Sequence, residues 1–123
     1  MKLKSEIARP RVYETLAANQ VYTVFGAAWA GETEVTGIAV STDGGQTWAE
    51  AEFLDPVGRH AWRRWQFAWL TPKKPGQYTL LARAKDANGN VQPDKHDQHY
   101  GTYVIDHTLP IEVFVDDPTG SPA

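Results

Sequence analysis

The sequence has no cysteine among its 123 residues. This absence excludes disulfide bonds, thiolate-bound metals and cysteine nucleophiles. Long apolar runs are missing too: no stretch approaches the ~20 consecutive apolar residues of a membrane-spanning helix, and the residues after Met1 are polar, unlike a signal peptide. We therefore expect a soluble domain, periplasmic or cytoplasmic, with no membrane partner.

Clustered positive charge is scarce as well. The formal net charge is −3 and the isoelectric point is near 5.7, whereas nucleic-acid binding draws its affinity from clustered Lys and Arg. The two basic pairs, Arg63-Arg64 and Lys73-Lys74, fit a solvated strand face and a solvated turn. No Gly-rich phosphate loop is present. We expect no nucleic-acid partner.

The chain is dominated by short apolar–polar alternation. Apolar residues recur with a period of two between Gly, Pro, Asn and Asp, and no long 3.6-residue period competes. The pattern predicts seven strands, near residues 8–15, 20–30, 34–41, 47–53, 61–70, 77–85 and 111–115. It indicates an all-β, immunoglobulin-like β-sandwich over residues 1–115, followed by a flexible tail over 116–123.

The alternation also assigns side chains to faces. Trp65, Phe67 and Trp69 share one face of the strand predicted at 61–70, so we expect three rings to point inward. In the next strand the same rule places Leu81 on the outer face. We therefore expect Leu81 to be exposed in a monomer.

Residues 41–48, STDGGQTW, fit the Asp-box pattern of a capped hairpin. The carboxylate of Asp43 would accept bonds from nearby amides, Gly45 would take a conformation that a side chain forbids, and Trp48 would anchor the return strand. This pattern predicts a structural turn rather than a ligand site.

Other polar residues give weaker signals for chemistry. His96 and His99 lie near two aspartates, Asp94 and Asp97, which suits a metal site in composition, but ligands three residues apart in a polar loop are not preorganised, so we expect a surface loop and no metal site. No nucleophile, base and orienting group are gathered in one motif. The five tryptophans suggest a carbohydrate-binding module as an alternative, with Trp62 as the exposed ring.

Five segments in order resemble the dimerisation domain of the sulfite oxidase family, an immunoglobulin-like domain of the E-set type. They are 26–31 (GAAWAG), 40–48 (VSTDGGQTW), 61–65 (AWRRW), 82–86 (ARAKD) and 88–93 (NGNVQP). The resemblance implies a homodimerising domain that accompanies a molybdenum-cofactor catalytic domain, where a cysteine ligates molybdenum beside molybdopterin. This chain, lacking cysteine, would then hold no cofactor and be no enzyme on its own.

The resemblance also raises the question of a substrate-pocket arginine. Some family members supply one from the segment before the last strand, but residues 98–103 here contain no arginine, so that role is not transferred. The expected function is a non-catalytic dimerisation and interaction domain. An alternative is a separate subunit that completes the substrate entrance of such an oxidoreductase in trans.

Pairing requires an exposed surface with apolar residues at its centre and charges at its rim. From the predicted faces we expect interface residues of both kinds; they are Trp62, Leu81, Phe114 and Val104, with Arg64 and Arg83 at the rim.

Overall fold

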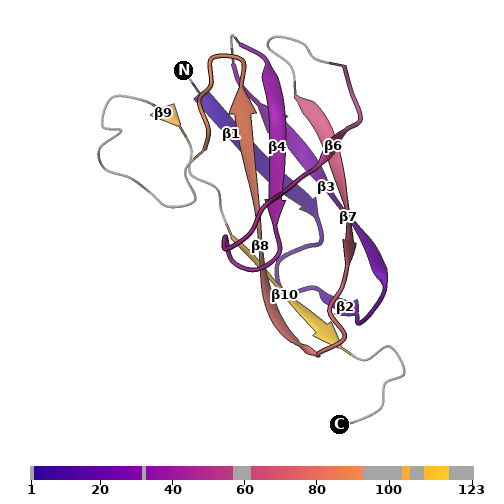
Figure 1. Ribbon diagram of the computed structural model, residues 1–123. Helices are drawn as coiled ribbons and strands as arrows, with labels where there is room; N and C mark the ends of the chain where they lie inside the picture. The colour runs from indigo at the N-terminus through magenta and orange to yellow at the C-terminus, as the bar shows by residue number, and fades with distance from the viewer. Residues whose placement is uncertain (1, 32, 57–61, 93–103, 106–109, 117–123) are drawn as a thin grey trace.

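The computed structural model describes residues 2–31, 33–56, 62–92, 104–105 and 110–116 (Figure 1). These residues form strands joined by turns and contain no helix. The strands are β1 (Lys2–Arg9), β2 (Thr15–Ala17), β3 (Val21–Trp29), β4 (Val35–Ser41), β5 (Ala49–Glu50), β6 (Glu52–Phe53), β7 (Arg63–Leu70), β8 (Gly76–Asp86), β9 (Val104–Ile105) and β10 (Ile111–Asp116).

The strands form two sheets that pack face to face. Sheet 1 has the order β6-β7-β3-β1-β9 and sheet 2 the order β2-β10-β8-β4-β5. Pairing is antiparallel except for β1 with β9 and β10 with β2, which are parallel. The predicted all-β, immunoglobulin-like sandwich is confirmed, and in Figure 1 sheet 2 lies in front of sheet 1.

The core lies between the two sheets and consists of the inward residues of each strand. Trp65 is fully buried, Trp69 is 6% exposed, and Phe67 packs partly buried against the same cluster, so the three predicted rings do point inward. From sheet 2, Leu80 and Val113 meet them with no exposed surface. Burial of such large apolar side chains provides the main driving force for folding.

Two predicted strands are each divided in the structure. The first, near 8–15, is replaced by β1, which begins at Lys2, and by β2, because the chain passes from sheet 1 to sheet 2 between Arg9 and Thr15. The strand near 47–53 is divided at Ala51: β5 pairs with β4 in sheet 2, and β6 pairs with β7 in sheet 1. Strand β9 was not predicted.

The predicted tail begins one residue too early. Asp116 belongs to β10 and is the register partner of Ala17 in β2. Residues 117–123 lie outside the described residues.

Leu81 is buried, so the prediction of an exposed side chain is wrong. Its side chain is 5% exposed, although it lies on the outer face of β8 together with Thr79 and Arg83. The Asp-box turn folds over that face: the Gly44 amide donates to the Thr79 carbonyl at 3.1 Å, and the Arg83 guanidinium lies 4.1 Å from the Trp48 ring centroid. Alternation predicts the face of a residue but not the loop that covers it.

A buried glutamine joins the two sheets near one end of the sandwich. Gln92 is 1% exposed, and its Oε1 accepts hydrogen bonds from Ser5 Oγ of β1 at 2.7 Å and from the Ala84 amide of β8 at 2.9 Å. Ser5 Oγ is also 3.1 Å from the Ala82 carbonyl. Buried polar groups are tolerated when they are bonded in this way, and here the bonds fix β1 against β8.

Gly26 permits the close approach of β1 and Trp65 to β3. A Cβ at this position would lie 1.9 Å from the carbonyl oxygen of Glu6 and 2.9 Å from the Trp65 ring. The register between β1 and β3 also shifts here, because Ile7 pairs with Gly26 and Arg9 with Phe25. Only glycine fits between the bulged β1 and the buried ring.

We predict that Gly26→Ala destabilises the domain toward the upper end of the ~1–3 kcal/mol typical of an overpacked core, because β1 or Trp65 must move. Gly37→Ala is the matched control, since its new Cβ would lie 3.6 Å from Lys85 Cβ, an ordinary contact; its effect should stay within about 1 kcal/mol. Urea unfolding followed by tryptophan fluorescence measures both. Equal effects of the two substitutions would contradict the steric argument.

Candidate functional site

The Asp-box turn is held by a closed set of hydrogen bonds centred on Asp43. Its Oδ1 accepts from Ser41 Oγ at 2.7 Å and from the amides of Gln46 and Thr47 at 3.0 and 2.9 Å. Its Oδ2 accepts from the Thr47 hydroxyl. Gly45 has φ of +98°, and its carbonyl accepts from Trp48 Nε1 at 3.2 Å.

These bonds occupy both carboxylate oxygens of Asp43 with groups of its own turn. The hydrogen bonds from Thr47, above all from its hydroxyl, lower the pKa of Asp43 to about 2, since a donor that bonds the charged form favours it. The arrangement therefore stabilises a hairpin and presents no free acid or base for chemistry.

The outward side chains of β3 and β7 form a largely apolar surface, the β3–β7 face. Val21 is 70% exposed and Leu70, its register partner, is 62% exposed. Further along, Ala68 is exposed and Phe25 is 41% exposed. Large exposed apolar side chains that adjoin one another are uncommon on soluble monomers and mark interaction surfaces.

Sequence reasoning did not select Val21, Phe25 or Leu70. A signal was present, because residues 67–70 (FAWL) are apolar at four successive positions, and 21–29 carries apolar residues at both odd and even positions. Strands covered on both faces have this composition. Period-two alternation alone predicts that only one face of each strand is apolar, so it does not select the outward residues of these strands.

At one end of this surface Trp62 lies beside Trp29. The ring centroids are 5.9 Å apart with an angle of 42° between the planes, and Lys4 Nζ lies 5.2 Å from the Trp62 ring centroid. Trp62 is 42% exposed, as predicted. The tilt between the rings means that they do not form a flat platform of the kind that the carbohydrate-binding alternative requires.

Arg64 is held by Asp55 in a forked ion pair. Arg64 Nη2 lies 2.8 Å and Nε 3.0 Å from the two carboxylate oxygens, and the Arg64 amide also donates to Oδ2 at 2.9 Å. The hydrogen bonds from Arg64 hold the pKa of Asp55 at about 2. Such bidentate pairing fixes the planar guanidinium in one orientation.

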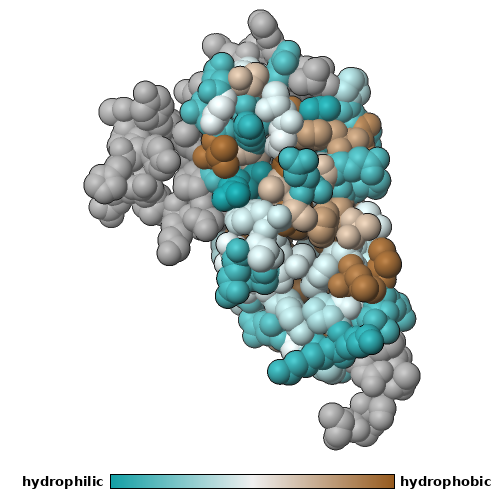
Figure 2. Space-filling model, viewed as in Figure 1, coloured by the Kyte–Doolittle hydropathy of each residue, from teal (hydrophilic) through white to brown (hydrophobic). Residues whose placement is uncertain are grey.

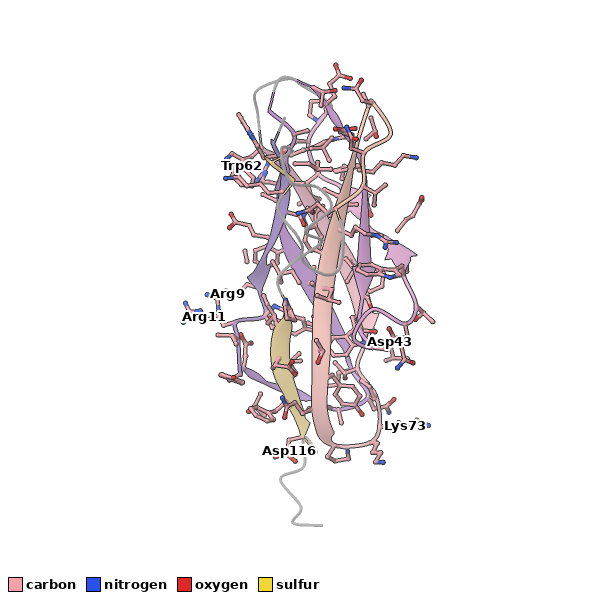
Figure 3. The ribbon with its side chains drawn as sticks, turned by 90° about the vertical axis from the view of Figure 1, so that its left-hand side faces the viewer. Arg9, Arg11, Asp43, Trp62, Lys73 and Asp116 are labelled. Carbon is pink, nitrogen blue, oxygen red and sulfur yellow. The ribbon has the colours of Figure 1, made fainter. Side chains whose placement is uncertain are left out.

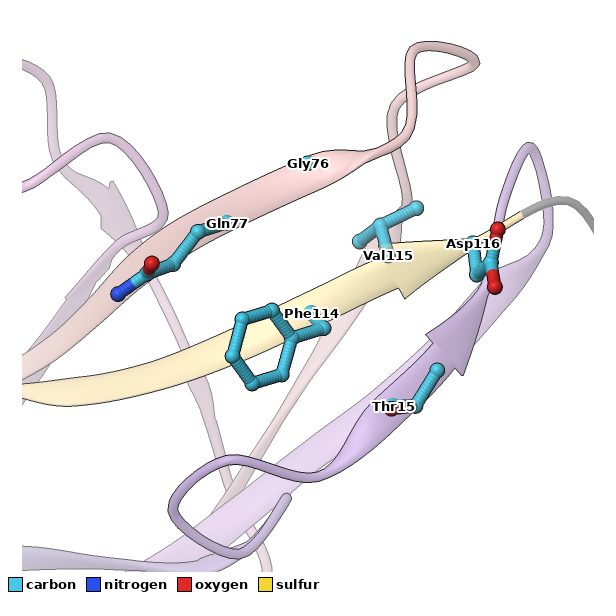
Figure 4. Close-up of a pocket in the computed structure, with 6 residues that line it drawn as sticks. All are labelled: Thr15, Gly76, Gln77, Phe114, Val115 and Asp116. Atoms are coloured by element: carbon cyan, nitrogen blue, oxygen red, sulfur yellow. The ribbon is translucent and has the colours of Figure 1, made fainter. Parts of the chain in front are cut away.

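On sheet 2, Phe114 is exposed beside Tyr13. The rings stack with centroids 6.1 Å apart and 26° between their planes. Phe114 lies between Thr15 of β2 and Gln77 of β8, in a shallow depression lined also by Gly76, Val115 and Asp116 (Figure 4).

The predicted interface residues thus fall on different parts of the sandwich. Trp62 and Arg64 lie on sheet 1, whereas Arg83 and Phe114 lie on sheet 2 and Leu81 is buried beneath the Asp-box turn. Trp62 and Arg9 project from one side of the molecule and Asp43 from the opposite side (Figure 3). The side chain of Val104 lies outside the described residues.

Within the described ranges, no group of three or more His, Asp or Glu side chains is placed to hold a metal ion. His96, His99, Asp94 and Asp97 lie outside those ranges, so the expected surface loop stays a prediction. No helix in the described part of the chain is long and apolar enough to cross a membrane.

Together these features define a class: an immunoglobulin-like sandwich whose prominent surface is an exposed apolar sheet face. The family model of the Mo-co oxidoreductase dimerisation domain matches residues 1–102. The chain belongs to this family, which confirms the resemblance inferred from its motifs.

Individual relatives agree with this assignment. Mitochondrial sulfite oxidase of Homo sapiens is 37% identical over 100 residues, which cover 76% of this chain and 18% of that protein. Sulfite oxidase of Gallus gallus is 34% identical over 100 residues, which cover 76% of this chain and 21% of that protein. The chain therefore spans about a fifth of the length of these curated relatives.

Solved structures show the same fold. The sulfane dehydrogenase SoxCD of Paracoccus pantotrophus matches with a TM-score of 0.65 and 28% identity, covering 76% of this chain and 24% of that chain. Fibronectin(III)-like modules of Clostridium thermocellum CbhA match with a TM-score of 0.63 and 10% identity, covering 93% of this chain and 98% of that chain. At that identity the second match shows the fold alone.

We predict that Asp43→Asn makes the domain less sensitive to acid. The folded-state pKa of Asp43 is about 2, below its ordinary value near 3.9, so its contribution is present above pH ~4 and is lost as the pH falls through 2. Asn does not titrate, so the variant should be less stable than the original protein at pH 7. It should also lose less stability as the pH falls from about 4 to about 2.

Thermal unfolding at several pH values measures this effect, with Glu50→Gln as a control that should leave stability at pH 7 unchanged. Because Asp55 has a similarly lowered pKa, part of the acid sensitivity should persist in the Asp43 variant. A pH profile identical to that of the original protein would show that the carboxylate does not hold the turn.

Proposed function

We propose that this chain is the non-catalytic dimerisation domain of a molybdenum-cofactor oxidoreductase similar to sulfite oxidase, and that two copies pair through it as a homodimer. The family supports a role in dimerisation. The observation that carries the proposal in this chain is the exposed apolar β3–β7 face, because a surface of this kind is stable in water when a partner covers it.

The interior of the domain supports a non-catalytic role. The buried polar side chains that the structure describes, Ser41, Thr71, Asp86 and Gln92, each bond within the chain. For example, Asp86 accepts from the Asn88 and Asn90 amides of its own turn at 3.0 and 2.9 Å. These groups hold the backbone and leave no polar set directed at a substrate.

The chain has no cysteine, so it cannot supply the cysteine ligand to molybdenum that the resemblance to the sulfite oxidase family implies. We propose that the cofactor belongs to a catalytic domain that this domain accompanies, and no step of the reaction is assigned to residues of this chain.

We predict that the chain forms a dimer of twice 13.7 kDa in solution, because pairing would cover the exposed apolar side chains. Sedimentation velocity over a wide range of protein concentration measures the mass. A single 13.7 kDa species at the highest concentration would contradict homodimerisation.

A separate assay tests the proposal that the domain is not catalytic. Added alone to sulfite and an electron acceptor, the chain should give no turnover, and added to a separately produced catalytic domain it should change the oligomeric state without changing the rate per molybdenum. A rate that depends on the added domain would favour the in-trans subunit instead.

A further inference from the structure

We propose that Asn88, in the turn after β8, is a site of spontaneous deamidation, and that its conversion to aspartate and isoaspartate loosens the link between the two sheets at that end. This covalent chemistry involves the single chain and water, so it is independent of the proposed dimerisation.

The residue that follows each asparagine separates Asn88 from the other two in the sequence. Asparagine is a chemically labile residue, because the backbone nitrogen of the next residue can attack its side-chain amide carbon, and a side chain on that next residue obstructs the attack. Asn19 is followed by glutamine and Asn90 by a β-branched valine, whereas Asn88 is followed by Gly89. Since glycine has no Cβ, the ring closes most readily at Asn88.

The turn presents the Asn88–Gly89 pair to solvent. Both residues are exposed, and Gly89 has φ of +84°, which suits a three-residue hairpin connection with a G1 bulge. A Cβ built at Gly89 would meet no atom within 4 Å. The turn lies at the upper end of the molecule in Figure 1, where Figure 2 shows hydrophilic residues. Water and base can therefore reach the pair.

The side chain of Asn88 is also less restrained than its neighbour. Asn90 Nδ2 donates to Asp86 Oδ2 at 3.0 Å, whereas no hydrogen bond holds the Asn88 side chain in the part of the chain that the structure describes. Asn88 Cγ can approach the Gly89 nitrogen by rotation about its own side-chain bonds.

The Asp43–Gly44 pair is the other place in the sequence where an aspartate or asparagine precedes glycine. There the side chain is fixed, because Asp43 Oδ1 accepts from the Gln46 and Thr47 amides and Oδ2 accepts from the Thr47 hydroxyl. Its carboxyl carbon cannot turn toward the Gly44 nitrogen while the Asp-box turn is closed. The same ring closure is therefore disfavoured at Asp43.

The reaction at Asn88 needs no reagent other than water. The Gly89 nitrogen gives its proton to a base in solution and forms a bond to Asn88 Cγ, the Cγ–Nδ2 bond breaks, and the amide nitrogen takes up a proton and leaves as ammonia. Water then opens the cyclic imide at either carbonyl. Opening at the backbone carbonyl gives isoaspartate, in which the main chain runs through the side-chain carbons, and opening at the other carbonyl gives aspartate.

One hydrogen bond of the turn restrains this chemistry. The Gly89 amide donates to the Asp86 carbonyl at 3.1 Å, so the attacking nitrogen must lose this bond as well as its proton. Turns of this kind open locally without unfolding of the whole domain. We therefore expect deamidation in the folded chain to be slower than in the unfolded chain and to accelerate as the pH rises.

Both products disturb the buried carboxylate of Asp86. Asp86 is 1% exposed, and its Oδ1 accepts from the Asn88 and Asn90 amides at 3.0 and 2.9 Å. Isoaspartate adds a backbone carbon between these two amides and so changes their spacing. Either product also places a new negative charge two residues from the Asp86 carboxylate.

The disturbance extends to the link between the sheets through Gln92. The Asp86 amide donates to the Asn90 carbonyl at 3.0 Å and holds the return segment beside β8. Two residues later, Gln92 Oε1 accepts from Ser5 of β1 and from the Ala84 amide of β8. A displaced return segment withdraws Gln92 from these partners, and buried polar groups that lose their partners destabilise the folded state.

Ageing the full chain at mildly alkaline pH tests the site. Trypsin releases residues 86–95, in which tandem mass spectrometry separates conversion at Asn88 from conversion at Asn90. We expect several-fold faster conversion at Asn88 than at Asn90 or Asn19. Asn88→Gln is the matched control, because its longer side chain closes a less favourable ring, and it should show no conversion at this position. Equal conversion at the three asparagines, or none at Asn88, would overturn the site.

The restraint and the consequence are measured on the same samples. Conversion in guanidinium chloride should be several-fold faster than in the folded chain, and equal rates would show that the turn does not protect Gly89. The deamidated form, separated by anion exchange, should have a lower urea midpoint than the aged Asn88→Gln variant and faster hydrogen exchange at the Ala84 amide. Unchanged values of both would overturn the effect on the link between the sheets.

Discussion

The close contact of β1 with β3 at Gly26 is the constraint on which the sandwich depends. The missing side chain lets the Glu6 carbonyl and the Trp65 ring occupy space that any Cβ would fill. With β1 in place, Ser5 reaches across to Gln92 and Ala82 of the second sheet. One glycine therefore permits the close contact of β1 with β3, and from β1 Ser5 bonds to the second sheet.

The Asp-box turn makes the two outer faces of the sandwich unequal. Its closed hydrogen bonds around Asp43 shape a short segment that lies against the middle of β8, whereas Val21, Phe25 and Leu70 on β3 and β7 are exposed. The turn therefore contributes to the difference between the two outer faces among the described residues.

The sequence was sufficient to predict the all-β sandwich, the inward rings of β7 and the capped turn, because period-two alternation and Gly–Asp chemistry are local properties. It was insufficient for Leu81 and for the division at Ala51, since both depend on which segment lies against which sheet. The exposed face was missed for a related reason: Phe25 and Leu70 are as apolar as core residues, and composition does not separate a buried face from an exposed one.

The fork between Arg64 and Asp55 has a consequence for recognition. A free arginine side chain explores many rotamers, and ordering such a side chain on association costs roughly 0.5–1.5 kcal/mol. Here the carboxylate already restricts the guanidinium within the single chain, although 67% of the Arg64 side chain is accessible to solvent. The Arg64 guanidinium is therefore already ordered on the β3–β7 face. Less side-chain entropy of Arg64 is lost when another surface contacts it.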